Sequence, residues 1–299
     1  RVAGVRINQV LGQAVQWLPD QKRLLVKSIV DQASPKRQAV PVGPAVQQTT
    51  SGLVAQVRTY QDLLKNPHDE DVFEHYGTSR LVVVDAATKA VAPFGIPAMY
   101  YGVTPSPDGT MLLVSTIARP FSYVVPASRF PMITSVMDWD GKVLRELQRN
   151  RLLDAIPIGG VPKGLRRISW LANAQHALYW FEAQDDGNPK NKVPHRDYAF
   201  LLADPKDSPR LWFKTEFRAG RLNFSGDGQL VLASEVDRQT RTERLWRLDI
   251  NKLSEPGTLV YERSIQDEYD NPGRAVSEMT IDGRSVMRFR NGKLFLSGR

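Results

Sequence analysis

A short unit recurs along the chain and limits its fold more than any other feature of the sequence. The unit is a polar turn carrying Asp-Gly or a close relative, followed by a short apolar run of strand-forming residues. Two copies are clear, because Ser106–Gly109 precedes 111–114 and Phe224–Gly228 precedes 230–232. Another copy stands at 17–20, and weaker copies stand at 169–173 and 281–283. Glycine adopts positive φ without steric cost and aspartate bonds its own backbone, so each copy predicts a tight turn that leads into a strand.

Each copy is followed by a second hairpin pattern. Strand-like runs at 81–85, 136–140, 200–204 and 245–249 each pass through a polar turn and return as another apolar run. The repeating unit is therefore two hairpins, or four antiparallel strands, which is the blade of a β-propeller. One blade needs about 40–50 residues, and successive copies of the turn lie farther apart than that. The longer intervals between copies must therefore contain insertions. We expect an all-β fold, a β-propeller of four-stranded antiparallel blades. The alternative, a β-sandwich, would not repeat the same turn at the same place in each unit.

The largest insertion, at about residues 54–77, has a helical pattern. It follows a stretch rich in Gln, Pro, Ser and Thr at 31–52, which predicts an extended loop. Gln56–Leu64 carries apolar residues at helical spacing, and we expect Pro67 to end that helix. The acids at 69–71 favour the first turn of a second short helix, Val72–Tyr76. A helical decoration on a β-repeat often covers an opening or contacts another domain.

Composition excludes several classes of protein. The absence of cysteine among the 299 residues excludes disulfides, zinc–cysteine sites, iron–sulfur clusters and a cysteine nucleophile. No run of apolar residues is long enough to predict a membrane span, and no signal peptide is visible at the first residues. The chain has 40 Lys and Arg against 32 Asp and Glu, a formal charge of +8. These cations are spread along the sequence, whereas a nucleic-acid binder concentrates them on one element, so we expect no nucleic-acid partner.

The sequence lacks the residue patterns of the common catalytic and metal sites. There is no Gly-x-Ser-x-Gly elbow, no His-Glu-x-x-His, and no glycine motif for phosphates or dinucleotides. His68 and His75 have the spacing of an ordinary surface pair on a helix rather than of zinc ligands. Asp138–Gly141 and Asp185–Asn188 look like the start of calcium loops, but turn chemistry explains both. We therefore expect no catalytic residue, no metal site and no cofactor within these residues.

Nine longer strings of the sequence carry a resemblance to a known family. They are Gln56–Lys65, Asp69–Tyr76, Pro105–Gly109, Arg119–Pro126, Arg129–Pro131, Asp154–Ile158, Arg166–Trp170, Leu178–Asp185 and Arg196-Asp197. These strings resemble the glutamyl endopeptidase branch of the prolyl oligopeptidase family of serine peptidases. The resemblance keeps the order of that family from about residue 9 to about residue 275, and the stretch 53–200 is the most specific.

The resemblance implies an N-terminal β-propeller and a C-terminal α/β-hydrolase domain that carries the Ser, Asp and His of a catalytic triad. We expect 1–299 to form one incomplete propeller domain, with its partner, the hydrolase domain of the same protein, beyond residue 299. Residues 1–8 resemble an early propeller strand and 9–12 a position more than a blade later. We therefore expect residues to be missing between Asn8 and Gln9. The oligomeric state stays open, and the resemblance favours a periplasmic or secreted location over a cytoplasmic one.

Two functions remain open. The resemblance implies a propeller that covers an active site, admits short or unfolded peptide substrates, and selects peptides for cleavage after glutamate. An arginine fork bonds both oxygens of a carboxylate, so arginines are the candidates for reading that glutamate. The candidates are Arg119, Arg129, Arg166, Arg167 and Arg196. Each of them can instead pair with an acid of the chain or face solvent.

The alternative function is a non-catalytic, TolB-like β-propeller scaffold for protein–protein interaction. A scaffold of this kind explains the repeated turns and the missing catalytic motifs equally well. It does not explain the helical insertion or the string Arg119–Tyr123.

Overall fold

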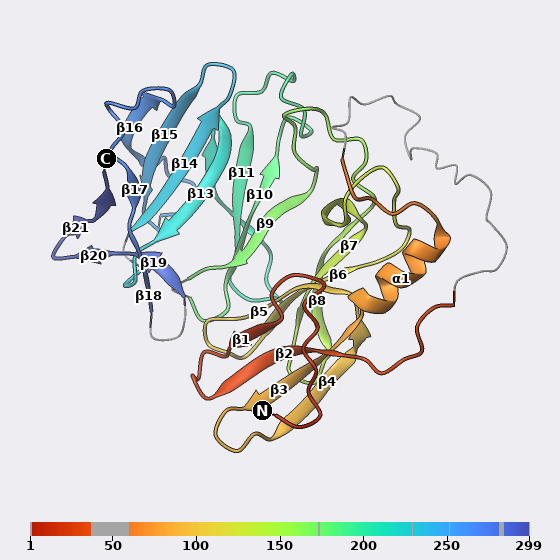
Figure 1. Ribbon diagram of the computed structural model, residues 1–299. Helices are drawn as coiled ribbons and strands as arrows, with labels where there is room; N and C mark the ends of the chain where they lie inside the picture. Colours follow the sequence, from red (N-terminus) through yellow and green to blue (C-terminus); the bar gives the residue numbers. More distant parts are fainter. Residues whose placement is uncertain are drawn as a thin grey trace. The chain divides into compact units, whose positions relative to one another are not determined.

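The computed structural model describes residues 2–36, 60–172, 174–228, 230–250, 252–280 and 284–298, and strands predominate among them (Figure 1). The chain divides into two compact units, Arg1–Gly160 and Val161–Arg299. Within the described residues, each unit contains two four-stranded antiparallel sheets whose strands are neighbours in the order of the sequence. This is the strand order of propeller blades.

The first unit contains the sheets β1–β4 and β5–β8. The strands of the first sheet are β1 (Val15–Trp17), β2 (Arg23–Ile29), β3 (Ser79–Asp85) and β4 (Val91–Ala98). Those of the second are β5 (Tyr100–Pro105), β6 (Leu112–Ile117), β7 (Met132–Met137) and β8 (Val143–Asn150). The helix α1 (Pro67–Gly77) lies between β2 and β3 in the sequence, and the short 3₁₀ helix η1 (Ala127–Arg129) lies between β6 and β7.

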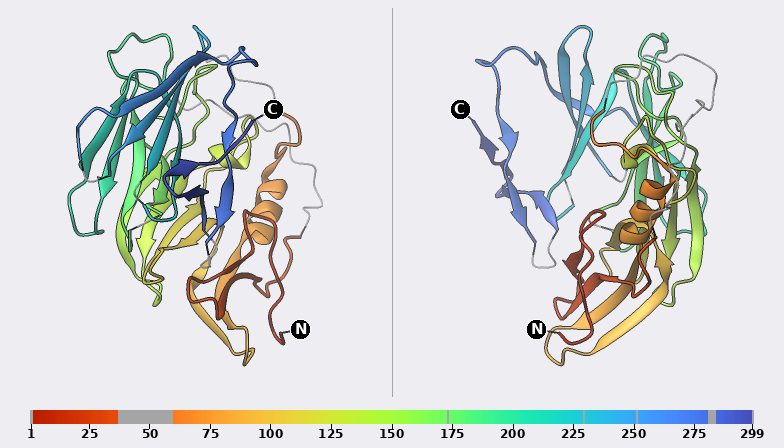
Figure 2. Two further views of the ribbon diagram at one scale, coloured as in Figure 1. Left: turned by 90° about the vertical axis from the view of Figure 1, so that its left-hand side faces the viewer. Right: turned by 45° about the vertical axis from the view of Figure 1, so that its right-hand side comes forward.

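The second unit contains the sheets β9–β12 and β13–β16 and a set of shorter strands. The first sheet consists of β9 (Leu165–Trp170), β10 (Leu178–Ala183), β11 (Asp197–Leu202) and β12 (Arg210–Thr215). The second consists of β13 (Arg218–Phe224), β14 (Val231–Asp237), β15 (Thr242–Leu248) and β16 (Thr258–Ser264). Both views of Figure 2 show the strands of a sheet side by side, each returning antiparallel to the one before it. The shorter pairs are β17 (Arg274–Ala275) with β22 (Leu296–Ser297), β18 (Ser277–Met279) with β19 (Ser285–Met287), and β20 (Phe289–Arg290) with β21 (Lys293–Leu294).

The repeated turn of the sequence closes the first hairpin of each four-stranded sheet. Between β5 and β6, the Ser106 N–H donates to the Met111 carbonyl at 2.8 Å and the Gly109 N–H donates to the Ser106 carbonyl at 2.9 Å. Between β13 and β14 the corresponding bonds join Ser225 with Leu230 at 2.9 Å and Gly228 with Ser225 at 3.1 Å. Gly109 and Gly228 have φ values of 69° and 74°, a region that glycine enters without strain. The turn prediction is therefore confirmed at both clear copies.

An apolar core lies between the two sheets of each unit. In the first unit it consists of Leu18, Leu25, Leu81, Tyr100, Val103, Leu112 and Val114, which come from both sheets. In the second unit the core is larger and more aromatic, because Phe181, Trp212, Phe213 and Phe224 join aliphatic residues of both sheets. Successive residues of a strand point to opposite faces of its sheet, so alternate apolar positions fill these cores. The predicted all-β fold with four-stranded propeller blades is confirmed.

The helical insertion is present, but its boundaries differ from the prediction. Pro67 was expected to end a helix and instead begins one, at the first position of α1, where its missing N–H is not needed. Asn66 caps the helix, because its Oδ1 accepts the Asp69 N–H at 2.9 Å. Asp69 and Glu70 lie in the first turn as expected. The predicted helix Gln56–Leu64 is wrong for 60–64, which is not helical, and 56–59 lie outside the described residues.

The segments on either side of Asn8 both run along β2. Ile7 forms a bridge with Ser28, the Asn8 N–H donates to the Lys27 carbonyl at 2.8 Å, and Val15 of β1 pairs with Val26. The expectation that residues are missing between Asn8 and Gln9, and that 1–299 is one incomplete propeller domain, stays a prediction.

Leu112→Ala tests the first core. Leu112 has no exposed surface and contributes to the core from β6. Its truncation removes apolar contacts and leaves a cavity, so we expect the free energy of unfolding to fall by about 2–5 kcal/mol. Equilibrium unfolding in guanidinium chloride measures the change. Leu144→Ala is the matched control, because Leu144 lies on β8 of the same unit and is 40% exposed. Similar losses in both variants would contradict the assignment of this core.

Candidate functional site

Arg119 lies between β6 and η1, and its guanidinium binds three carboxylates of α1. Its Nη1 lies 2.7 Å from Glu70 Oε2, its Nη2 lies 2.9 Å from Asp71 Oδ1, and its Nε donates to Glu74 Oε2 at 2.9 Å. Burial alone would lower the pKa of Arg119, but these bonds and charges outweigh it and raise that pKa. The side chain remains 41% exposed, so solvent screens the cluster. All three nitrogens of the Arg119 guanidinium therefore already bind carboxylates of α1.

Three phenylalanines hold the same loop against the helix. The Phe73 ring on α1 meets the Phe121 ring edge-on at 5.3 Å and the Phe130 ring edge-on at 5.8 Å, while Phe121 and Phe130 stack at 5.3 Å. The Arg119 guanidinium lies over the Phe121 ring at 4.8 Å. We call Phe73, Phe121 and Phe130 the aromatic trio. Together with the ion cluster, the trio fixes the loop 118–131 to α1 at two adjoining places.

Tyr123 belongs to the same contact. Burial, a hydrogen bond to Glu70 and the charges of Glu70 and Asp69 raise the pKa of Tyr123 to about 12. The neutral phenol donates to a carboxylate that also binds Arg119, so deprotonation would place two negative charges side by side.

Arg129 ends η1 and has a different environment. Its guanidinium lies over the ring of Tyr60, 5.6 Å from the ring centroid, and its Nη1 donates to the Leu153 carbonyl at 3.4 Å. The Arg129 carbonyl accepts the Leu153 N–H at 2.9 Å, which holds the base of the side chain. The residue is half-buried. Within the part of the chain that the structure describes, Arg129 forms no ion pair. Its charge is therefore uncompensated by any described carboxylate.

Arg166 and Arg196 lie in the second unit and are tied into one network. Arg166 on β9 forms an ion pair with Asp197, and Arg196 Nη1 lies 2.9 Å from Asp185 Oδ2. Arg218, at the start of β13, joins the two halves by pairing with Asp185 and by placing its Nη1 2.7 Å from Asp197 Oδ1. Both carboxylate side chains are fully buried. We call these five residues the arginine–aspartate network.

Burial and pairing have opposite electrostatic effects in this network. Burial would raise the pKa of Asp185, but Arg218, Arg196 and the Gly187 N–H outweigh it and hold that pKa below its ordinary value. Burial lowers the pKa of Arg166 despite the charge of Asp197. Asp197 also accepts the Ala219 N–H at 2.7 Å, so the network joins β9, β11 and β13. Both carboxylates bind arginines and N–H groups of the protein itself, and the network thereby connects strands of the fold.

Arg167 faces solvent and bonds to the backbone. Its guanidinium donates to the Gly220 carbonyl, and its own φ of 55° lies in the left-handed region. The five predicted arginines therefore have different partners. Arg119 and Arg129 share the first unit, Arg166, Arg167 and Arg196 lie in the second, and Arg129 is distinguished from the other four by its environment.

Sequence reasoning did not single out Tyr60, which contacts Arg129, or Arg218, which belongs to the arginine–aspartate network. Tyr60 lies 69 positions from Arg129, and Arg218 lies 33 positions from Asp185, so no local pattern joins them. The acids of α1 carried a signal, because Glu70 and Glu74 are one helical turn apart and share a face with a common cation.

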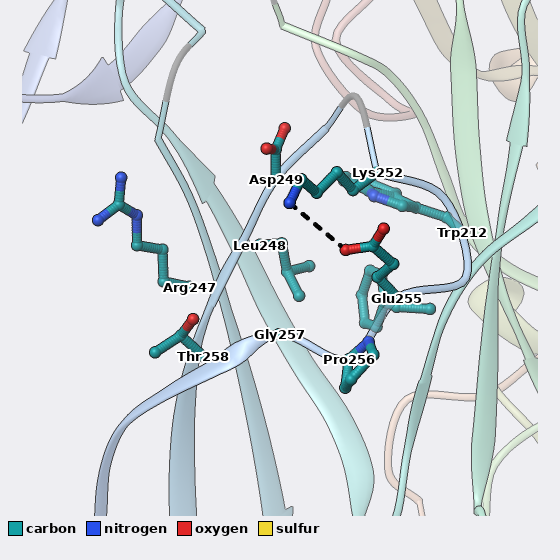
Figure 3. A pocket seen from close by; sticks show the side chains of 10 residues that line it. Trp212, Arg247, Leu248, Asp249, Lys252, Glu255, Pro256, Gly257 and Thr258 are labelled. Atoms are coloured by element: carbon teal, nitrogen blue, oxygen red, sulfur yellow. Dashed lines mark ion pairs between the residues drawn. The ribbon is translucent and has the colours of Figure 1, made fainter.

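A separate pocket of about 300 Å³ lies in the second unit beside the β15–β16 loop (Figure 3). Trp212, Phe213 and Leu248 contribute its apolar lining, and Arg247, Asp249, Lys252 and Glu255 its charged lining. Lys252 Nζ lies 3.6 Å from Glu255 Oε2, and both side chains are largely exposed. The two positive and two negative side chains balance, and none of the predicted arginines lines the pocket. We assign it no function.

The described residues contain no group of three metal-binding side chains placed to hold an ion. In the same residues no helix is long and apolar enough to cross a membrane. The Asp138–Gly141 segment is a hairpin turn, in which the Asp138 side chain accepts two backbone N–H groups. Asp185 begins a turn as well, but its buried carboxylate serves Arg196 and Arg218.

Asp197→Ala tests the arginine–aspartate network. The change leaves the buried guanidinium of Arg166 without its carboxylate, so we expect the free energy of unfolding to fall by about 3–5 kcal/mol. Asp197→Asn keeps one acceptor and should cost less. The control is Glu146→Gln, which breaks the exposed pair with Arg149 and should leave the free energy of unfolding nearly unchanged, because solvent screens that pair. Guanidinium unfolding of the three variants checks this order, and an equal effect of Asp197→Ala and Glu146→Gln would contradict it.

Tyr123→Phe tests the raised pKa. An unfolded tyrosine titrates near pH 10, whereas the folded Tyr123 keeps its proton to about 12. The stability that this proton contributes is fully present below about pH 10 and is lost as the pH rises through about 12. The wild-type protein should therefore lose more of its free energy of unfolding than Tyr123→Phe between about pH 9.5 and about pH 11.5. Urea unfolding at the two pH values measures this difference, and equal losses would refute it.

No family model matches the chain, but two curated proteins are closely similar to it. Over 260 residues it is 37% identical to "Probable glutamyl endopeptidase, chloroplastic" of Oryza sativa subsp. japonica, which covers 85% of the chain. Over 280 residues it is 36% identical to the protein of the same name from Arabidopsis thaliana, which covers 91% of the chain.

Among solved structures, the β-propeller domain of the trilobed protease from Pyrococcus furiosus is 9% identical to the chain. The match has a TM-score of 0.45 and covers 96% of this chain and 71% of that one. The chain spans 28% of the length of the two curated relatives. The resemblance stated from the sequence is thereby confirmed: over most of its length, this chain is a homologue of proteins named glutamyl endopeptidase.

Proposed function

We propose that this chain is the gating and substrate-selecting propeller of a serine endopeptidase that cleaves peptides after glutamate. Two findings support the proposal: the relatives are named glutamyl endopeptidases, and the chain has the four-stranded sheets of a propeller. The chain corresponds to 28% of those relatives, which leaves room for a C-terminal α/β-hydrolase domain in the same protein. In this proposal the catalytic triad belongs to that domain, and the propeller supplies no reacting group.

The chemistry assigned to the propeller is exclusion and selection. A cover over the active site admits short or unfolded peptides and keeps folded proteins out. Selection for glutamate needs a cation that is partly removed from water, because the attraction between charges is weak in bulk solvent. An arginine is suited to this task, since two parallel N–H groups bond the two carboxylate oxygens.

Arg129 is the residue that we propose for this contact. The observation that carries the proposal is its half-buried guanidinium, which lacks a carboxylate partner within the described residues. Arg119 already binds three carboxylates of α1. Arg166 and Arg196 bind buried aspartates, and Arg167 binds a backbone carbonyl. A substrate carboxylate would have to displace those partners, whereas at Arg129 it would supply a missing one.

The alternative is a non-catalytic TolB-like scaffold, and no contact of the described residues favours it. Labelling of the native protein with a serine-directed fluorophosphonate separates the two functions. The peptidase should be labelled at a serine of its hydrolase domain, whereas a scaffold should not react.

Arg129→Ala in the full-length protein tests the proposal. Loss of a charged hydrogen-bonding partner costs about 1.5–3 kcal/mol, or about 10- to 150-fold. We expect kcat/KM to fall by that factor for peptides with glutamate before the scissile bond and to stay within about twofold when glutamine replaces it. Arg149→Ala, on the exposed face of β8, is the matched control and should leave both substrates unaffected. An unchanged preference for glutamate over glutamine in Arg129→Ala would show that Arg129 does not read the substrate.

A further inference from the structure

We infer that Tyr60 is a positioning residue for substrate selection: its ring holds the Arg129 guanidinium by a cation–π contact and leaves N–H groups of that guanidinium to a substrate carboxylate. The inference rests on the proposed function of Arg129 and adds to it a second residue from a distant part of the sequence. It names the carboxylate group of a peptide as the ligand of the site.

The contacts of Arg129 define which part of its guanidinium is occupied. Cζ of the guanidinium lies over the Tyr60 ring, 5.6 Å from the ring centroid, and Nη1 reaches the Leu153 carbonyl at 3.4 Å. No described residue accepts a hydrogen bond from Nε or Nη2. A guanidinium has five N–H donors in one plane. The ring and the carbonyl therefore position the guanidinium, while Nε and Nη2 have no partner among the described residues.

Tyr60 is itself held in place. It is partly buried and packs against an apolar cluster that includes Phe121, Val125 and Phe130. Leu64 and Phe73 of the same insertion pack on this cluster too. The loop 118–131 thus meets the insertion twice, once where Arg119 binds the acids of α1 and once where Arg129 lies over Tyr60. The first contact fixes the insertion, and the second transmits that fixed position to Arg129.

An oriented guanidinium discriminates between a carboxylate and an amide. Two parallel N–H groups along one edge match the two oxygens of a glutamate. A glutamine offers one oxygen and one NH₂ group, whose donors face the donors of the arginine. A freely rotating arginine would lose part of this discrimination, because ordering a long side chain on binding lowers the affinity. The Tyr60 ring reduces that loss by holding the guanidinium before the substrate arrives.

The test compares variants of the full-length protein on peptides with glutamate or glutamine before the scissile bond. Tyr60→Ala and Tyr60→Leu remove the π face, and Tyr60→Leu keeps most of the apolar volume. We expect both to raise KM for the glutamate peptide about 3- to 10-fold with kcat within about twofold, and to leave the glutamine peptide unchanged. Tyr60→Phe keeps the ring and should behave as the wild type. Added to Arg129→Ala, Tyr60→Leu should have no further effect, because the two residues act through one contact.

Leu64→Ala is the matched control, because Leu64 packs on the same apolar cluster and, as an aliphatic residue, offers Arg129 no π face. It should leave the preference for glutamate unchanged. If Arg129→Ala keeps the full preference, the proposed function is wrong and the role of Tyr60 is lost with it. If Arg129→Ala loses the preference while Tyr60→Leu keeps it, the role of Tyr60 alone is overturned. The same holds if Leu64→Ala reproduces the effect of Tyr60→Leu, or if both peptides weaken equally.

Discussion

The hydroxyl of Ser106 donates to Asp108 and accepts the Met111 N–H, and Ser225 makes the same pair of bonds with Asp227 and the Leu230 N–H. Both serines are fully buried. A buried hydroxyl and a buried N–H must find partners, so this local network determines the geometry of the hairpin that opens a sheet. The following strands then pair in sequence order, and the cores form where two such sheets meet within a unit. The first hairpins of the sheets β5–β8 and β13–β16 depend on this turn.

The proposed site depends on departures from that regularity. The insertion between β2 and β3 and the loop between β6 and η1 meet through Arg119, the acids of α1 and the aromatic trio. These contacts satisfy Arg119 and leave Arg129 over Tyr60 with a charge that no described carboxylate balances. The difference between two arginines ten positions apart is therefore one of partners. It separates a residue that holds the fold from the residue that we propose for binding a substrate carboxylate.

Much of the architecture could be predicted because its causes are local. The Asp-Gly turns and the apolar runs after them lie within a few residues of each other, and the strands formed where these patterns stood. Pro67 was misread because proline is compatible with both the end and the first turn of a helix, and Asn66 decides between them by capping. The arginine candidates came from resemblance, and their sorting into paired and unpaired residues was beyond any local pattern. The partners of Arg119 lie 45 to 49 positions away.

The class of the fold, its repeated hairpins and its likeness to the glutamyl endopeptidases follow from the order of residues along the chain. Each of these rests on turn chemistry, on alternation along a strand, or on ordered strings of residues. Which charges are balanced, in contrast, follows from the folded arrangement alone. Electrostatic pairing depends on distance in space, and the chain brings Arg119 to α1, Arg218 to two buried aspartates, and Arg129 to the ring of Tyr60.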